Sequence, residues 1–81
     1  MARLTFEDLA GIMRECAGAD ESADLIAGTT FEELGCDSLA VLQIASQIQN
    51  RYQVKIPDEA IEELTSPTSM VDYVNQRLAA A

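Results

Sequence analysis

The sequence contains no histidine, and only five of its 81 residues are lysine or arginine. Histidine is the commonest general base and metal ligand in proteins, so its absence excludes self-contained Ser–His or Cys–His catalysis. Five basic and fourteen acidic residues give a formal net charge of −9. This charge argues against nucleic acids and anionic membrane surfaces as partners, and favours docking onto positively charged protein surfaces.

Cysteine is also scarce, with Cys16 and Cys36 alone. Two cysteines are too few for a disulfide framework, and their spacing is not that of a zinc site, so we expect no metal. Cys16 falls on an apolar helix face and is predicted to be a buried free thiol. Cys36 is interpreted as a small residue that fits its site. No run of residues matches the loop of a calcium-binding hand.

Long apolar runs are missing as well. No run could cross a bilayer, and residues 1–8 lack the apolar region of a signal peptide. The chain is nevertheless 48% hydrophobic, which is too apolar for a disordered segment. Because 81 residues cannot form two independent cores, we expect one domain over residues 1–81. Without a signal peptide or a membrane span, the protein is expected to be soluble and cytoplasmic. We also expect it to be a monomer.

Apolar residues recur at helical spacing in most of the chain, which predicts three longer helices. The first covers residues 5–17, with a capping box at its start and Gly18 as its stop. The second covers residues 38–52 and is capped by Asp37 or Ser38. The third follows Ser66 and continues to Leu78. A short acidic helix over residues 58–64 precedes it.

The stretch from residue 19 to residue 37 has no sustained period and is rich in residues typical of turns and caps. We expect a long loop with one short turn around residues 31–34. Its predicted apolar anchors are Leu25, Ile26, Phe31 and Leu34. Because no segment reads as a strand, the predicted fold is all-α: a small four-helix bundle of three longer helices and one short third helix, with a long loop between helices one and two.

The segment Leu34-Gly35-Cys36-Asp37-Ser38-Leu39 joins this loop to the strongest predicted helix. Gly35 allows a tight turn, and Ser38 lies at the amino end of a helix, where free amides and the helix dipole favour an anion. A phosphate on the Ser38 oxygen would therefore be held favourably. Taken alone, however, Asp-Ser before an apolar helix is an ordinary N-cap.

With its neighbours, this segment resembles the attachment motif of the acyl carrier proteins. The resemblance continues in Ile56-Pro57-Asp58-Glu59 and in Val71-Asp72-Tyr73-Val74-Asn75, and so covers nearly the whole chain. Three further segments resemble the carriers of type II (aromatic) polyketide synthases. They are Glu15-Cys16-Ala17-Gly18, Ser38-Leu39-Ala40 and Asn50-Arg51-Tyr52.

The resemblance implies that Ser38 carries 4′-phosphopantetheine, added from coenzyme A by a phosphopantetheinyl transferase that supplies the base and Mg²⁺. Acyl groups would then travel as thioesters on the thiol of this arm. The chain would be a carrier, a substrate of enzymes and not itself an enzyme. Its implied partners are the transferase, a malonyl transferase, a ketosynthase and tailoring enzymes.

Partner contacts and cargo contacts are expected around Ser38. Asp37 adjoins the serine, and Leu39 with Leu42 lies off the predicted core face, so these three are expected to contact partners. Acidic residues that could steer the carrier onto basic partner surfaces are Glu32, Glu33, Asp58, Glu59, Glu62 and Glu63. We expect a closed core in the unloaded chain, which could open for cargo along a lining of Val41, Ala45, Ala60, Ile61 and Leu64.

The chain departs in one respect from the fatty-acid carriers, which typically have several acids along the second helix. Residues 39–52 contain no acid, and their only charge is Arg51. Contact is therefore expected to depend more on Leu39 and Leu42, with the charge supplied by Glu32, Glu33 and the helix at residues 58–64.

Other readings of the sequence remain open at this point. A fatty-acid-synthase carrier is one. A peptidyl carrier is another, although such carriers usually have Gly-Gly-His or Gly-Gly-Asp before the serine, where this chain has Gly35-Cys36-Asp37. An acidic interaction module would leave Ser38 unmodified. A Gly-Asp-Ser-Leu esterase is excluded because Cys36 interrupts that motif and no histidine could activate the serine.

Overall fold

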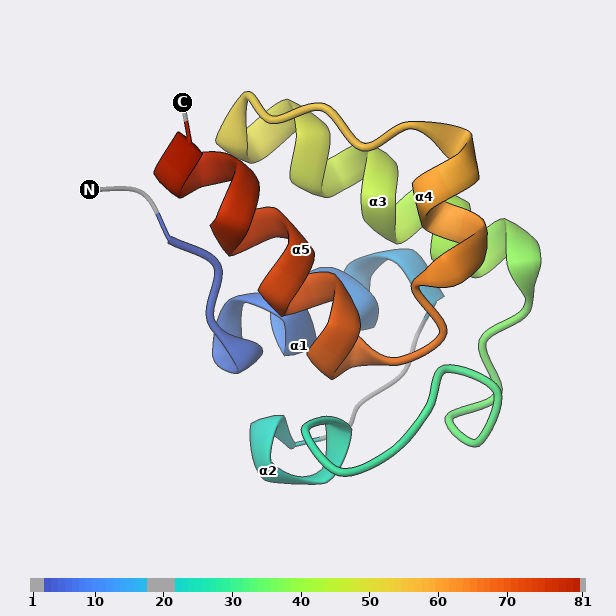
Figure 1. Cartoon of the computed structure of the whole chain (residues 1–81). Coiled ribbons are helices and arrows are strands. Elements are labelled where there is room, and N and C mark those ends of the chain that lie inside the picture. The colour runs from blue at the N-terminus through green and yellow to red at the C-terminus, as the bar shows by residue number, and fades with distance from the viewer. Residues whose placement is uncertain (1–2, 18–21, 81) are drawn as a thin grey trace.

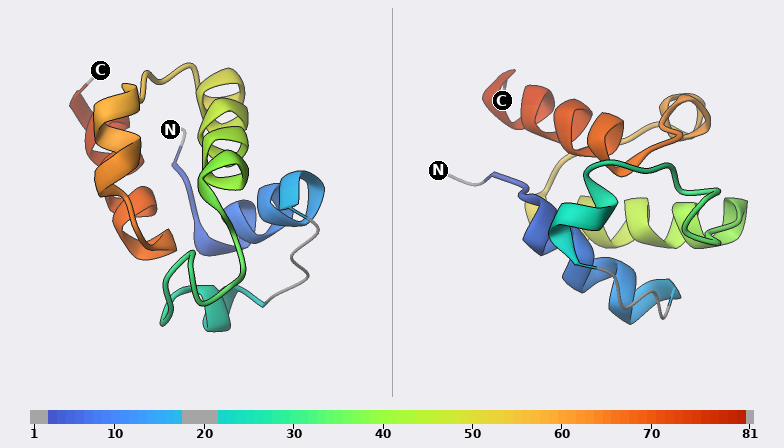
Figure 2. Two further views of the ribbon diagram at one scale, coloured as in Figure 1. Left: turned by 90° about the vertical axis from the view of Figure 1, so that its right-hand side faces the viewer. Right: turned by 90° about the horizontal axis from the view of Figure 1, so that it is seen from below.

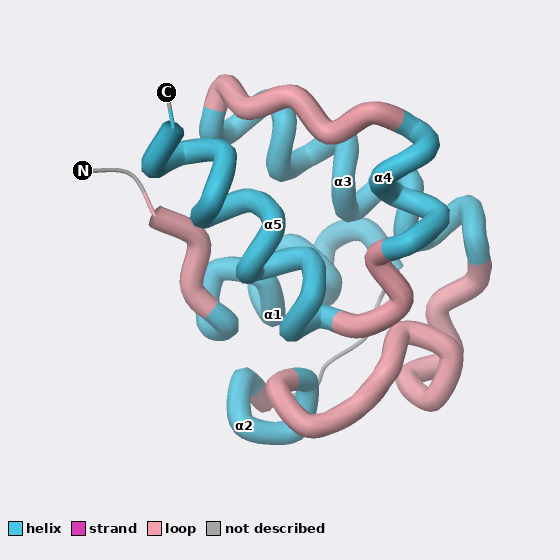
Figure 3. Tube along the Cα trace, viewed as in Figure 1, coloured by secondary structure: helices cyan, strands magenta, loops and turns pink. Residues whose placement is uncertain are grey.

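The computed structural model describes residues 3–17 and 22–80, and within them the chain forms five helices (Figure 1). They are α1 (Phe6–Ala17), α2 (Ala23–Ile26), α3 (Ser38–Tyr52), α4 (Asp58–Glu63) and α5 (Pro67–Ala80). These two stretches contain no strand, and the all-α prediction is confirmed (Figure 3). The predicted stop at Gly18 and the first residues of the predicted loop lie outside the described residues.

The helix starts follow the predicted capping chemistry. At α1, the Asp8 amide donates to the Thr5 hydroxyl at 3.1 Å and the Thr5 amide donates to the Asp8 carboxylate at 3.4 Å, which is a capping box. At α5, the Ser69 amide donates to the Ser66 hydroxyl at 3.2 Å. Because these side chains bind amides that have no partner within the helix, they fix where each helix begins.

Helix α2 was not expected. It is a single turn, started by the Leu25 amide donating to the Ser22 hydroxyl at 3.2 Å. The turn buries Ile26 completely and leaves Leu25 51% exposed, so the prediction that Leu25 anchors the loop is wrong. A four-residue helix is shorter than two turns, so its sequence cannot show a helical period.

The core lies between α1 and the other helices. Helix α1 packs against α2, α3 and α5, and α3 also contacts α4. Figure 2 shows α3 and α5 on separate sides of the bundle. The side chains with no exposed surface include Leu4, Leu9, Met13, Ile26, Ile44, Ala45, Ile48, Met70 and Val74. The bundle therefore buries the apolar stripes that the sequence predicted for the longer helices.

Cys16 corrects another prediction. It is a free thiol, as expected, but it is half-buried at the end of α1. Its Sγ lies 3.9 Å from the carbonyl oxygen of Gln43 on α3. The neighbouring residue Glu15 forms an ion pair with Arg51, which is also on α3. Cys16 therefore lies at the rim of the α1–α3 interface, where the predicted apolar face reaches solvent.

Backbone and side-chain hydrogen bonds hold the long connection between α2 and α3 against the end of the chain. The Phe31 amide donates to the Thr65 carbonyl oxygen at 3.0 Å, and the Thr68 hydroxyl donates to the Ala27 carbonyl oxygen at 2.8 Å. The Phe31 side chain is 3% exposed. This connection is thereby fixed beside the α4–α5 junction, and it leads directly into the start of α3.

Candidate functional site

The segment before α3 is a short turn that ends at a glycine. The Cys36 amide donates to the Phe31 carbonyl oxygen at 2.9 Å, and the Gly35 amide donates to the Glu32 carbonyl oxygen at 3.0 Å. Gly35 has a φ of 81°, a left-handed conformation that side chains other than glycine adopt at a cost. This pair of bonds with a left-handed glycine is a Schellman motif, and it stops the turn so that Cys36 is buried beneath it.

Asp37 caps α3, which resolves the choice between Asp37 and Ser38. Its carboxylate accepts a hydrogen bond from the Ala40 amide at 2.8 Å, and its backbone is extended. Ser38 is therefore the first residue of the helix and does not need its hydroxyl for capping. Ser38 is exposed, and within residues 3–17 and 22–80 its hydroxyl has no hydrogen-bond partner.

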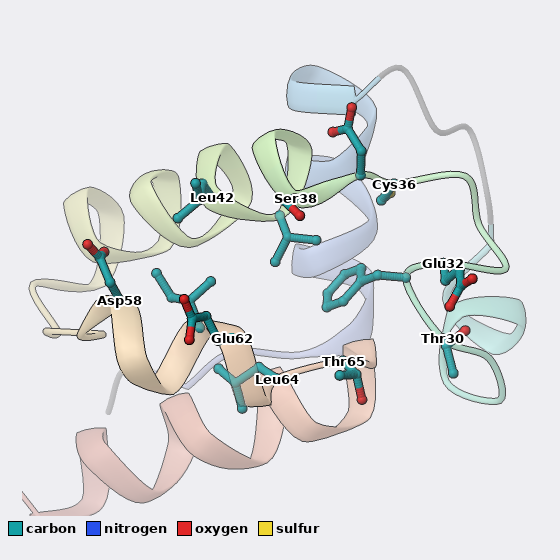
Figure 4. Close-up of a pocket in the computed structure, with 13 residues that line it drawn as sticks. Thr30, Glu32, Cys36, Ser38, Leu42, Asp58, Glu62, Leu64 and Thr65 are labelled. Atoms are coloured by element: carbon teal, nitrogen blue, oxygen red, sulfur yellow. The ribbon is translucent and has the colours of Figure 1, made fainter.

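A cleft of about 600 Å³ opens beside Ser38. Figure 4 shows Ser38 and Leu42 on one side of it, with Asp58, Glu62 and Leu64 opposite and Thr30 and Glu32 at one end. Its walls come from the connection before α3, the first turns of α3, and the α4 region. The lining residues are Thr30, Phe31, Glu32, Cys36, Asp37, Ser38, Val41, Leu42, Asp58, Ile61, Glu62, Leu64 and Thr65. The side chains of the core itself, such as Ile44, Ile48 and Met70, have no exposed surface, and the expected opening of this core for cargo stays a prediction.

Three predicted cargo contacts, Val41, Ile61 and Leu64, line the cleft. The other two, Ala45 and Ala60, are not among its lining residues, and their contact with cargo stays a prediction. Ala45 is completely buried in the core on a later turn of α3, and Ala60 is half-buried on α4. The helical period identifies the buried face of a helix, but it does not distinguish positions that face a cleft from positions that face the core.

The sequence did not indicate other residues that line the cleft, notably Phe31 and Thr65. They come together through the hydrogen bond between the Phe31 amide and the Thr65 carbonyl oxygen. The only sequence signal for Phe31 was its isolation as an aromatic residue in a polar connection, which predicted an anchor. Nothing in the sequence pattern indicated Thr65.

The cleft is rimmed by acids. Four carboxylates line it, those of Glu32, Asp37, Asp58 and Glu62, and no lysine or arginine is among the lining residues. The remaining predicted partner acids, Glu33, Glu59 and Glu63, are exposed outside it. Four of the seven predicted acids thus share the cleft with Ser38, and the assignment of all seven as partner contacts stays a prediction.

Two large apolar side chains are exposed next to Ser38. Leu39 is 63% exposed and Leu42 is 42% exposed, on the first turns of α3. Exposure of apolar side chains at neighbouring positions is typical of a docking surface. Their predicted separation from the core face of this helix agrees with the structure.

The cysteines show no sign of an activated nucleophile. Burial, and to a smaller extent the neighbouring carboxylate of Asp37, raises the pKa of the Cys36 thiol. Burial also raises the pKa of Cys16, with a smaller contribution from Glu15. Both thiols therefore stay protonated near neutral pH. In the part of the chain that the structure describes, no cluster of three acidic or cysteine side chains could hold a metal, and no helix is long and apolar enough to span a membrane.

Comparisons with known proteins agree with this site. Residues 7–74 match the family described as "Phosphopantetheine attachment site". The anthracycline acyl carrier protein DauA of Streptomyces sp. (strain C5) is 47% identical over 100% of this chain and 99% of that protein. The oxytetracycline polyketide synthase acyl carrier protein of Streptomyces rimosus is 39% identical over 100% of this chain and 88% of that protein.

Solved structures show the same likeness in three dimensions. The actinorhodin holo acyl carrier protein of S. coelicolor superposes with a TM-score of 0.84 at 35% identity, over 99% of this chain and 96% of that one. The oxytetracycline acyl carrier protein superposes with a TM-score of 0.83 at 38% identity, over 99% and 87%. The chain therefore belongs to the phosphopantetheine attachment family, as an acyl carrier protein of the type II polyketide synthases that bears a covalent 4′-phosphopantetheine and is a carrier rather than an enzyme.

Proposed function

We propose that Ser38 is the residue to which 4′-phosphopantetheine is attached. The observation that carries this proposal is the state of its hydroxyl, which is exposed and without a hydrogen-bond partner in the described part of the chain. In the transfer, the Ser38 oxygen forms a bond to the β-phosphorus of coenzyme A. Its proton goes to the base of the transferase, and adenosine 3′,5′-bisphosphate leaves.

The start of α3 fits the phosphodiester that this step produces. The first amides of a helix have no partner within the helix, and Asp37 takes only that of Ala40. The amides of Ser38 and Leu39 remain at the positive end of a 15-residue helix. Free amides and the helix dipole both favour a negative group at this point.

We further propose that acyl cargo on the arm enters the cleft beside Ser38. Phe31, Val41, Ile61 and Leu64 give it an apolar lining, and its volume of about 600 Å³ is that of a small-molecule site. Burial there would remove a reactive thioester chain from water between encounters with enzymes. The arm supplies the thiol that holds the chain, and the residues of the cleft supply the shelter.

The partner enzymes are proposed to be a phosphopantetheinyl transferase, a malonyl transferase, a ketosynthase and tailoring enzymes. Exposed acids around Ser38 support docking onto basic surfaces, and Leu39 with Leu42 supports apolar contact at the centre. Asp37 would then have two tasks, as the cap of α3 and as a charged contact. We propose that the carrier acts as a monomer in the cytoplasm, where coenzyme A is available.

Intact-mass measurement tests the attachment site. The purified chain is incubated with coenzyme A, Mg²⁺ and a promiscuous phosphopantetheinyl transferase, alongside Ser38→Ala and Ser46→Ala. Ser46 is a matched control because it is exposed on the same helix. The native chain and Ser46→Ala should each gain one phosphopantetheine group and Ser38→Ala none. A gain by Ser38→Ala, or no gain by the native chain, contradicts the proposal.

A further inference from the structure

We infer that the cleft selects its cargo by charge: it admits uncharged acyl and oxoacyl chains and excludes a malonyl group. The inference rests on the proposed attachment at Ser38 and names the class of cargo that the cleft takes. A malonyl thioester ends in a carboxylate, whereas the chain that grows from it by decarboxylative condensation ends in an uncharged group. The two kinds of cargo on the same arm would therefore occupy different positions.

The first argument is the charge at the opening. Glu32, Asp37, Asp58 and Glu62 line the cleft, and no cation lines it. The phosphodiester on Ser38 would add a further negative charge at the same rim. A malonyl carboxylate that enters must approach all of these groups without an opposite charge to pair with, and like charges at short range repel each other.

The second argument is the apolar lining of the cleft. Beneath the rim, the wall consists of Phe31, Val41, Ile61 and Leu64, of which Phe31 is 3%, Ile61 7% and Leu64 8% exposed. A carboxylate moved from water onto such a surface loses its hydration and gains no donor, which is unfavourable. An uncharged chain gains from the burial of its apolar carbons. Thr30 and Thr65 also line the cleft, and a threonine hydroxyl is a hydrogen-bond donor of the kind that the ketone oxygens of an oxoacyl chain accept.

Both arguments act in the same direction and give the carrier two modes. A malonyl group stays outside the cleft, in solvent, where a ketosynthase can reach it. An uncharged oxoacyl chain, which is prone to react with itself, is drawn into the cleft.

A matched pair of cargoes tests the inference, because malonyl and acetoacetyl groups have nearly the same shape and differ in a carboxylate against a methyl ketone. Each is attached to Ser38 through a hydrolysis-resistant amide analogue of the thioester. Methyl chemical shifts of Val41, Ile61 and Leu64 are then compared with those of the arm alone. Acetoacetyl should shift all three, and malonyl should leave them unchanged.

Charge-neutral variants supply the control. Asp58→Asn with Glu62→Gln removes two rim carboxylates, whereas Glu59→Gln with Glu63→Gln removes two acids of the same helix that do not line the cleft. With each exposed charge pair changing an equilibrium by about twofold, the rim variant should raise the bound malonyl population by about fourfold and the control variant should not.

The outcomes are distinct. Equal shifts from malonyl and acetoacetyl, or equal effects of the two double variants, would overturn the charge selection. Shifts from neither cargo would overturn both the selection and the cleft as a cargo site. The attachment at Ser38 would still stand or fall separately on the intact-mass measurement.

Discussion

Replacing Gly35 with alanine measures what the turn before Ser38 requires of its backbone. Gly35 has a φ of 81°, and a Cβ built on it meets no atom within 4 Å. The substitution therefore introduces no steric clash with the rest of the protein. Its cost is the left-handed conformation alone, about 1–2 kcal/mol for an L-residue other than glycine.

Gly11 offers a matched control of opposite sign. It lies inside α1, its Cβ would also meet no atom within 4 Å, and its φ is not in the left-handed region. Alanine is favoured over glycine inside a helix by about 0.5–1 kcal/mol. Gly11→Ala should therefore stabilise the protein, although both substitutions add the same methyl group to open space.

Thermal unfolding followed by far-UV circular dichroism measures both effects. A domain of this size shifts in Tm by about 4–8 °C per kcal/mol, so the two variants should fall on opposite sides of the native protein. Gly35→Asn should lie between Gly35→Ala and the native protein, since asparagine tolerates the left-handed region better than alanine. Stability changes of the same sign in Gly35→Ala and Gly11→Ala would refute the reasoning.

Three further predictions concern charge and protonation. Asp37→Ala should lower the free energy of unfolding by about 1 kcal/mol, because the Ala40 amide loses its cap. Asp37→Asn should retain most of the stability that the cap provides. Equal losses of the two variants in urea unfolding would exclude the capping role. Reversal of charge at Glu62 and Glu63 should slow transferase loading more than Gln47→Lys on α3, and a loading-rate comparison with equal effects would contradict this. Burial raises the pKa of Cys36, so the folded thiol stays protonated at a pH where the unfolded thiol ionises. The free energy of unfolding should therefore fall as the pH rises from about 8.5, and it should fall by less in Cys36→Ala.

The parts of the fold that the sequence predicted are those with local causes. Helix α3 begins and ends at the predicted residues because its apolar stripe continues over four turns. The start of α1 was predictable since Thr5 and Asp8 form a capping box three residues apart. Helix α2 was missed because one turn has no period, and the exposure of Leu25 depends on how that turn lies against α1.

The site divides in the same way. The helix start at Ser38 could be predicted, because a glycine, an N-cap residue and an apolar helix follow one another in the chain, whereas the choice of Asp37 over Ser38 as the cap needed the structure. The cleft could be predicted only in part: Val41, Ile61 and Leu64 were named, but the contribution of Phe31 and Thr65 depends on a contact between residues distant in sequence. Ala45, which was also predicted as lining, does not line the cleft, because the helical period shows that a residue is buried and does not show what covers it.

Cargo selection and partner docking are proposed to use the same carboxylates, and this has a consequence for the loaded carrier. Glu32 and Glu62 line the cleft and are also exposed to an approaching enzyme. A basic partner surface that pairs with them attracts the carrier and, at the same time, neutralises part of the rim. Docking would therefore weaken the exclusion of anions while the partner's own groups compete for the cargo. Because α3 has no acidic residue, this coupling falls on the connection before it and on α4, the two elements that form the opening.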